Sequence, residues 1–312
     1  MLDDFAPEVI HQHGQFFDLA FLSSWYARRH NVPHLTSVHA RLEHDNPVIG
    51  SIFAAIDRTC IRLPIDLARS NVVIMDKRML EYVRRRYKTP TSRLVFIPVG
   101  IDTTRFTNLS EHNTPNNIRK AYGLDERPIL LSVGHITPFR NRVALVRAVA
   151  ALQHRGLNFQ CVIVGGEHDT RYRQEANRLG IADDLIVTGA VTKGEITQFL
   201  AEATMEMHDL QREGLGTASL EAMASGLPVI SDIDPDNFPG LRLLGDEHLV
   251  LVRHGDEAQL ADEAARLLTD PIRRQKIGSA GRAFVLENFS IERVAQQHLE
   301  AYESLLATTH RE

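Results

Sequence analysis

The sequence has little cysteine and no long apolar run. Its only cysteines, Cys60 and Cys161, lie far apart in apolar surroundings, so two buried thiols are expected in place of a disulfide or metal site. No segment approaches the ~18 apolar residues that a membrane-spanning helix needs. The first residues, MLDDFAPEVI, lack the basic start and apolar stretch of a signal peptide. These absences exclude a disulfide-rich secreted fold and favour a cytoplasmic location.

The sequence also lacks an excess of positive charge. It carries 35 Lys and Arg against 40 Asp and Glu, a formal net charge of −5, which argues against a general nucleic-acid binder. Residues 1–110 hold 14 Lys and Arg against 11 Asp and Glu, and the remainder holds 21 against 29. The N-terminal third is therefore the mildly basic part.

What is present is enough apolar material for two cores. Hydrophobic residues make up 43% of the 312 residues, and at about 150 residues per domain the length favours two domains. From residue 129, short β-branched runs such as ILLSVG alternate with amphipathic helices. The preceding part repeats this pattern in PEVIHQHG, PHLTSVHA, NVVIMD and RLVFIPVG. Continuous apolar strands between helices predict α/β domains with parallel sheets covered on both faces.

A polar segment separates the two patterns. TNLSEHNTPNN is rich in Asn and contains Pro, as linkers often are, and the last helix is expected to follow Ser290 as its N-cap. That helix could pack back across the domain junction. The predicted parts are a first Rossmann-like domain, a linker, a second Rossmann-like domain and the terminal helix, at residues 1–106, 107–117, 118–289 and 290–312.

Ligands of parallel α/β domains bind at the carboxyl ends of the strands, where helix N-termini point. After ILLSV, Gly134 lets the backbone approach a ligand closely, and Arg140 and Arg142 supply positive charge that suits a phosphate. Solvated arginines at a helix start are an open alternative. The glycines of VGGEHD likewise fit a phosphate, a sugar or a plain βα turn.

The stretch EGLGTASLE combines several requirements. Gly214 and Gly216 bracket Leu215, so the amides of Leu215, Gly216 and Thr217 can face an anion at the start of a helix. Glu221 follows one turn later on the same face as Thr217. A carboxylate there would repel phosphate but accepts hydrogen bonds from two neighbouring hydroxyls, as a ribose offers.

The other acid of this stretch, Glu213, stands before the bend and would face the group beyond the phosphate. Ribose, diphosphate and sugar follow one another in this order in a nucleotide sugar. The alternative is that both glutamates are surface acids, and the apolar neighbours Leu220 and Met223 disfavour it for Glu221.

Several segments together resemble one family. Two glutamates eight positions apart, followed by EAMASGLPV, stand beside IPVGIDTTRF, VIVGGE, VTKGEITQFLAEA and VRHGDEAQLADEAARLL. These motifs resemble those of retaining GT-B glycosyltransferases of family 4, and the resemblance covers nearly all of the chain. It implies a GT-B fold of two Rossmann-like parallel-sheet domains.

The resemblance also implies roles for single residues. It assigns Glu213 to the donor sugar, Glu221 to the ribose hydroxyls and the amides between them to the diphosphate. In the family, an Arg and a Lys neutralise the charge of the diphosphate. His135 and Arg140 occupy the corresponding positions of this sequence. His39, in TSVHA, matches the histidine near the reacting centre. Glu213, His39 and Arg140 are thus the implied catalytic residues.

The implied reaction moves a sugar from a nucleotide diphosphate, with uridine as the expected base, to an acceptor hydroxyl with retention of configuration. It needs no metal or other cofactor, because the leaving diphosphate can deprotonate the acceptor. The expected acceptor is a glycan, a lipid-linked or a small molecule, in cell-surface polysaccharide or glycolipid synthesis. Peripheral contact with the inner face of the membrane would fit such acceptors.

The chain departs from the family at its beginning. Family members carry a glycine-rich loop and further βα units before the segment that resembles PEVIHQHG, so the first domain is expected to be incomplete, with an exposed sheet edge that favours oligomers. A non-catalytic nucleotide-binding or assembly subunit is therefore an alternative, and a sugar-nucleotide epimerase a less favoured one. The segment SDIDPDNFPGL also replaces the family's G-G-x-P-E loop.

Two histidines, a basic helix and the tryptophan indicate a function less clearly. His11 and His13 share one face of a strand, and a structural or acceptor-side role is favoured over a metal site. The helix KRMLEYVRRRYK carries a basic face, for which a solvated surface is favoured over a membrane or anionic-acceptor contact. Trp25 is expected on the core face of its helix.

The substitution of His135 for the family arginine generates a prediction. Histidine changes charge between pH 5 and 8, so the affinity for a nucleoside diphosphate is expected to strengthen as the pH falls from about 7.5 to 6. Titration calorimetry across this range measures it. A dissociation constant that is independent of pH would contradict the prediction.

Overall fold

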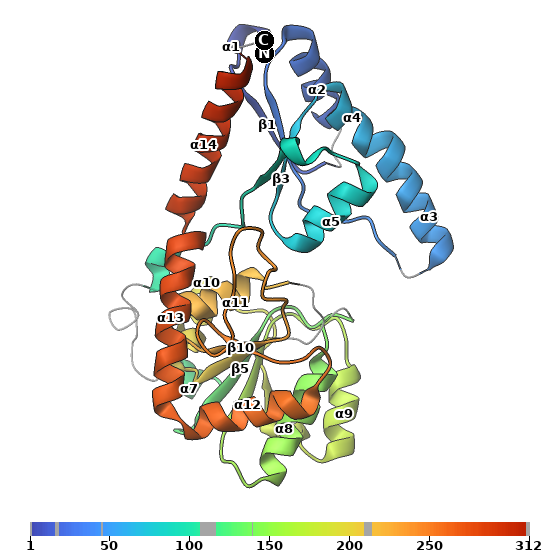
Figure 1. The fold of residues 1–312 in the computed structure, drawn as a ribbon. Helices are drawn as coiled ribbons and strands as arrows, with labels where there is room; N and C mark the ends of the chain where they lie inside the picture. The colour runs from blue at the N-terminus through green and yellow to red at the C-terminus, as the bar shows by residue number, and fades with distance from the viewer. Residues whose placement is uncertain are drawn as a thin grey trace. The chain divides into compact units, whose positions relative to one another are not determined.

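Short strands, several of them rich in branched apolar residues, form two parallel sheets in the computed structural model of the chain (Figure 1). The structure describes residues 2–15, 19–44, 46–106, 117–138, 140–208 and 214–309. The chain divides into two compact units. The first comprises residues 1–100, 236–241 and 292–312, and the second comprises residues 101–235 and 242–291.

The sheet of the first unit has four parallel strands in sequential order. They are β1 (Ile10–His13), β2 (His34–Ser37), β3 (Asn71–Ile74) and β4 (Leu94–Phe96). Ile10 pairs with His34 and Val72 with Leu94. β1 is an edge strand of the described sheet.

Helices cover both faces of this sheet. Val95 and Ile97 face α14, whereas Phe96 packs with Ile74 and Tyr82 on the other face, because successive side chains of a strand alternate. The helical elements of the unit are α1 (Leu2–Phe5), α2 (Leu19–His30), α3 (Pro47–Ile56), the π-turn η1 (Asp57–Ile61), α4 (Arg62–Leu67), α5 (Lys77–Arg86), η2 (Thr91–Arg93) and α14 (Ile291–Thr309).

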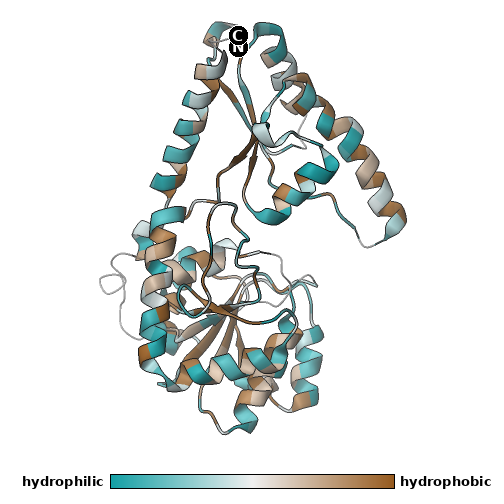
Figure 2. Ribbon diagram, in the orientation of Figure 1, coloured by the Kyte–Doolittle hydropathy of each residue, from teal (hydrophilic) through white to brown (hydrophobic). Residues whose placement is uncertain are grey.

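The sheet of the second unit has six parallel strands in the order β10-β9-β8-β5-β6-β7. All five residues of β5 and of β6 are buried, which explains their mainly apolar sequence. Figure 2 shows these strands in brown, as the most hydrophobic part of the unit. The strands are β5 (Ile129–Val133), β6 (Gln160–Val164), β7 (Leu185–Val187), β8 (Met205–Met207), β9 (Val229–Ser231) and β10 (Val250–Leu251).

The helices of the second unit follow its strands. Thr192 caps α10 in a reciprocal capping box with Glu195, and Gly180 ends α9 in the left-handed conformation. The helical elements are η3 (Thr103–Phe106), α7 (Asn117–Ala121), α8 (Arg142–His154), α9 (Arg171–Leu179), η4 (Ala182–Asp184), α10 (Lys193–Glu202), α11 (Thr217–Ala224), α12 (Glu257–Thr269) and α13 (Pro271–Phe289).

The structure confirms the α/β class with two parallel sheets and corrects two details. Cys161 is buried as predicted, but Cys60 is exposed. Trp25 is 56% exposed, because α2 buries Ala20, Ser24 and Ala27 against the unit instead. None of the described helices is both long and apolar enough to cross a bilayer.

The ends of the compact units differ in detail from the ranges predicted for the domains. Residues 101–106 group with the second unit, residues 236–241 group with the first, and the first unit resumes at Glu292. Within the first unit, Tyr302 of α14 lies 2.7 Å from His11 Nδ1, and Val294 packs on Leu35 and Val73. The predicted linker falls largely on residues 107–116, which lie outside the described residues.

Candidate functional site

Two glycine loops meet at the carboxyl ends of β5 and β6. A Cβ atom at Gly165 would lie 2.2 Å from the carbonyl oxygen of Gly134, so only glycine fits there. Backbone bonds join the loops further on, from Ile136 N–H to Gly166 O at 2.9 Å and from His168 N–H to Ile136 O at 2.8 Å. The loops after these two strands therefore form one closely packed surface.

The guanidinium of Arg140 lies on this surface. A Cβ atom at Gly134 would lie 2.7 Å from Arg140 Nη1, and one at Gly216 would lie 4.0 Å from Nη2. The arginine thus stands between the loop after β5 and the start of α11. The structure brings together Gly134, Arg140 and Gly216, which the sequence places up to 82 residues apart.

The start of α11 has a glycine at its N-cap. Gly216 has no side chain to cap the helix, and no bond from another described side chain to the first helix amides is present. Before it, Gly214 has a φ of 93° and Leu215 is buried, so the chain turns sharply into the helix. The first N–H groups of a helix are unsatisfied within it, and they favour an anion.

His135 lies beside the same loops. A Cβ atom at Gly166 would lie 3.0 Å from His135 Nδ1, and the ring of His168 stands with its centroid 5.6 Å from that of His135. Two imidazoles therefore flank the surface that carries Arg140.

Glu221 lies one turn into α11 and is held by Arg105, for which the sequence pattern predicts no role. Arg105 Nη1 donates to Glu221 Oε1 at 3.2 Å, and its Nη2 donates to Lys193 O and Thr197 Oγ1, both at 2.8 Å. Burial raises the pKa of Glu221, and Arg105 opposes that shift. The match of IPVGIDTTRF to the family motif includes Arg105 and could have marked it.

Arg142 does not belong to this surface. It is 3% exposed, and its guanidinium donates to Ser132 Oγ and to Gly134 O, the latter at 3.2 Å. Ser132 Oγ in turn donates to Met207 O at 2.7 Å. The positive charge that the sequence suggests for a phosphate is instead used inside the unit, where it fixes the peptide of Gly134.

A buried polar chain ties the turn before α11 to the sheet. Ser219 Oγ donates to Glu206 Oε2 at 3.0 Å and lies 2.8 Å from His208 Nδ1. His208 Nε2 lies 3.2 Å from the carbonyl oxygen of Gly214. These contacts position the glycine turn, and nothing in the sequence pattern singles them out.

Two predicted catalytic residues are not assigned to this group. Glu213 lies outside the described residues. His39 belongs to the first unit, where it is exposed at the carboxyl end of β2, with His39 Nε2 3.4 Å from His13 Nδ1. Burial and neighbouring imidazoles lower the pKa of His11 to about 3, and the same causes lower those of His13 and His39.

Two other segments singled out in the sequence lie in the first unit. Residues 236–241, part of the segment that replaces the family's acidic loop, lie against the start of α5. Lys77 N–H donates to Asn237 O at 2.6 Å, and Lys77 Nζ pairs with Asp236 at 2.7 Å. His11 and His13 form no metal-binding group with other described residues.

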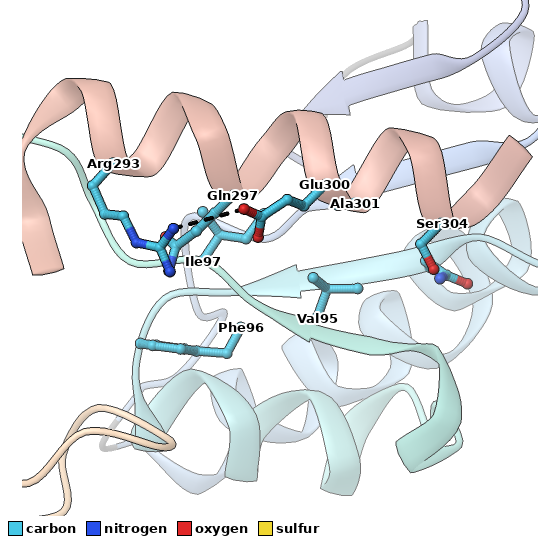
Figure 3. Close-up of a pocket in the computed structure, with 9 residues that line it drawn as sticks. Val95, Phe96, Ile97, Arg293, Gln297, Glu300, Ala301 and Ser304 are labelled. Carbon is cyan, nitrogen blue, oxygen red and sulfur yellow. Dashed lines mark ion pairs between the residues drawn. The ribbon is translucent and has the colours of Figure 1, made fainter. Parts of the chain in front are cut away.

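A pocket of about 300 Å³ lies between α14 and β4 of the first unit. Figure 3 shows Arg293 and Glu300 reaching toward each other along α14, where they pair at 3.7 Å, with Val95 and Ile97 beneath. No predicted site residue lines this pocket. The candidate site is the open surface formed by the glycine loops and the start of α11.

Two protein families match the chain. The profile of "Glycosyl transferases group 1" matches residues 115–284, which contain the glycine loops, Arg140 and α11. The profile of "Glycosyltransferase Family 4" matches residues 1–105. The chain belongs to the group 1 glycosyltransferases of family 4.

Curated relatives of this glycosyltransferase include two proteins of Mycolicibacterium smegmatis. A GDP-mannose-dependent alpha-(1-6)-phosphatidylinositol monomannoside mannosyltransferase of Mycolicibacterium smegmatis is 29% identical over 219 residues, 67% of this chain and 56% of that protein. The chain thus spans just over half the length of this relative. The alpha-maltose-1-phosphate synthase of the same organism is 29% identical over 328 residues, 97% of this chain and 80% of that protein.

Solved structures with the same fold include a glycosyltransferase of Rickettsia africae, with a TM-score of 0.76 and 18% identity over 98% of this chain and 78% of the other. Anabaena HepE in complex with UDP and glucose gives a TM-score of 0.74 and 17% identity, over 97% and 79% of the two chains. These likenesses establish the GT-B fold of the glycosyltransferase.

The buried chain behind the glycine turn generates a prediction. Replacing Ser219 with Ala removes the hydroxyl between Glu206 and His208, and we expect the free energy of unfolding to fall by about 1–3 kcal/mol. The affinity for a nucleoside diphosphate should fall as well, because the turn loses its anchor. Chemical denaturation and titration calorimetry measure both.

The matched control is Ser225→Ala, at the end of the same helix, where Ser225 Oγ donates to Ala222 O at 2.7 Å. This variant should bind the nucleotide as the wild type does. An unchanged affinity in Ser219→Ala would show that the buried chain does not position the turn.

Proposed function

We propose that the glycosyltransferase moves a sugar from a nucleotide-diphosphate donor to an acceptor hydroxyl with retention of configuration. The observation that carries the proposal is the position of the Arg140 guanidinium beside both Gly134 and the uncapped start of α11. A fixed cation and free helix amides on one surface suit a diphosphate.

The amides of Leu215, Gly216 and Thr217 would bind the diphosphate together with Arg140. His135 lies close enough to the same loops to add a donor. Charge on the leaving diphosphate grows as the bond to the sugar breaks, so donors fixed before the reaction lower its barrier. These residues would therefore act on the transition state as well as on binding.

Glu221 fits the ribose of this donor. Arg105 occupies one side of its carboxylate, which leaves lone pairs for the two ribose hydroxyls. The carboxylate stands a turn behind the helix amides, so it is removed from the phosphate charge. Glu213, at the other end of the turn in sequence, is proposed to contact the sugar.

The proposed step breaks the bond between the anomeric carbon and the diphosphate oxygen and forms a bond to the acceptor oxygen on the same face. The acceptor proton passes to a diphosphate oxygen, so the leaving group serves as the base. His39 is proposed to align the reacting groups from the acceptor side. The protein then supplies alignment and electrostatic stabilisation.

The donor is proposed to be a UDP-sugar, with the HepE complex with UDP and glucose in support. The mannosyltransferase relatives, whose names give GDP-mannose, support a second base for the same tests. Their acceptor is a phosphatidylinositol mannoside, which favours a glycolipid or other glycan acceptor and contact with a membrane surface.

The proposal is tested with UDP- and GDP-sugars and the purified chain. Binding is measured by calorimetry, and release of the nucleoside diphosphate is measured with phosphoglycolipid and glycan acceptors. Binding followed by acceptor-dependent release is expected. Binding without release in every mixture would favour a non-catalytic subunit, and absence of binding would contradict the donor site.

The variant Glu221→Gln should weaken donor binding without lowering the free energy of unfolding. Loss of the carboxylate that holds the ribose should weaken donor binding at least tenfold, about 1.4 kcal/mol. The raised pKa of Glu221 means that its ionised form destabilises the folded chain, so the variant should unfold no more readily than the wild type near pH 7.

The direction of the pKa shift of Glu221 sets the pH range in which the variant and the wild type differ in stability. The folded chain holds the proton of Glu221 more tightly than the unfolded chain, so any stability difference is present above the folded pKa and disappears toward about pH 4. Denaturation at several pH values measures it, with the exposed Glu126→Gln as control. A variant that is much less stable and still binds the donor would refute the assignment.

A further inference from the structure

Large apolar side chains gather on the surface of one group of helices in the first unit. Of the fourteen that are exposed among the described residues, nine lie on α2, α3 and α4. α2 packs against α4, and α3 continues through η1 into α4 (Figure 1). This exposed apolar set comprises Leu19, Phe21, Leu22, Trp25, Val48, Ile52, Ile56, Leu63 and Leu67.

The helix α3 is the clearest case. Its sequence, PVIGSIFAAI, contains no charged residue, yet none of its residues is buried. Val48, Ile52 and Ile56 recur every four residues on one face, and Val48 and Ile52 are 67% and 54% exposed. Figure 2 shows brown residues along this helix. An apolar helix that the core does not use indicates an interaction surface.

The hydroxyls on this stretch are already satisfied by the helix itself. Ser51 Oγ donates to Pro47 O at 2.8 Å, and Thr59 Oγ1 donates to Ala55 O at 2.7 Å. Asn46 caps the first amides of α3. Moving α3 out of water would therefore leave few hydrogen bonds unmade, which lowers the cost of burying it in an apolar medium.

The charges around the exposed apolar set are mainly positive. Arg28 and Arg29 end α2, and Arg58 is exposed beside α3. The acids of the same helices are neutralised or hidden, since Asp66 pairs with Arg62 at 2.8 Å and Asp57 is fully buried. A surface of this kind complements an anionic partner.

The exposed tryptophan adds a feature of lipid interfaces. The Arg29 guanidinium lies 5.7 Å from the centre of the Trp25 ring, close enough for a cation–π contact. Tryptophan prefers the level of lipid headgroups, and arginine beside it can reach the phosphates. A protein partner would instead need a matching apolar groove with acidic rims.

We propose that α2 and α3 dock this glycosyltransferase on an anionic lipid bilayer. α3 lies in the plane of the interface with Val48, Ile52 and Ile56 among the acyl chains, and Arg28, Arg29 and Arg58 contact headgroup phosphates. The docking surface differs from the basic face of α5, where Arg85 pairs with Glu43 at 2.5 Å and Arg86 lies 3.8 Å from Asp57.

The chain provides its own probe, because Trp25 is its only tryptophan. Vesicles of phosphatidylcholine with and without about a third of phosphatidylglycerol are added to the full chain, and Trp25 emission and co-sedimentation are recorded. The expected result is a blue shift and binding with the anionic vesicles, weakened by salt. Vesicles with brominated acyl chains should quench the emission.

Substitutions test the surface with Trp25 in place. Ile52→Glu should weaken vesicle binding at least tenfold, and Arg58→Gln about fivefold. Ile272→Glu, at a 79% exposed position in the second unit, is the matched control and should bind as the wild type does. Far-ultraviolet circular dichroism and calorimetry with a nucleoside diphosphate establish that each variant is folded.

Three outcomes would overturn the proposal. These are no binding to anionic vesicles, equal binding by Ile52→Glu and the wild type, and a blue shift that depends on protein concentration without vesicles, which would assign the surface to a second copy of the chain. Nucleotide binding is measured separately, so failure of docking and failure of the proposed donor site are distinguished.

Discussion

The candidate site depends on how closely two backbone loops approach at the carboxyl ends of β5 and β6. The carbonyl of Gly134 occupies the space that a side chain at position 165 would need. This contact excludes a side chain at position 165, and the Arg140 guanidinium lies over Gly134 beside the start of α11. A larger residue at either glycine would push the two loops apart and move the arginine away from the helix amides.

Some polar side chains of the second unit point into the unit, and others lie on the loop surface. Arg142 points inward and fixes the peptide of Gly134, while Arg140, two residues earlier, lies on the loop surface. Ser219 and His208 likewise lie inside the unit, where they contact each other and His208 contacts the turn that leads into α11. Buried charges are costly unless they are paired and hydrogen-bonded. Placing these groups behind the loops makes the backbone of the proposed phosphate site rigid before a ligand arrives.

The first unit uses buried polar groups in the same way beneath the loop that follows β2. Gln15 Nε2 donates to Ala40 O at 2.6 Å, and the amide of Leu42 donates to Tyr82 Oη at 2.9 Å, so the loop after β2 is held from beneath. Tyr82 in turn donates to the buried Asp57 at 2.6 Å. Asp57 starts the π-turn between α3 and α4, which links this loop to the helices that carry the exposed apolar set.

The sequence by itself determined the α/β class, the parallel strands and the family, because these follow from local apolar periodicity and from motifs such as EGLGTASLE. It also predicted that Gly134, Arg140 and Gly216 belong to one site. Tertiary structure alone decided which arginine faces outward, since Arg140 and Arg142 look alike in sequence and differ only in what packs around them. Tertiary structure likewise decided the pairing of Arg105 with Glu221, because such contacts join residues far apart in the chain. It also decided the exposure of Trp25, because a helical pattern does not show which apolar face the core leaves uncovered.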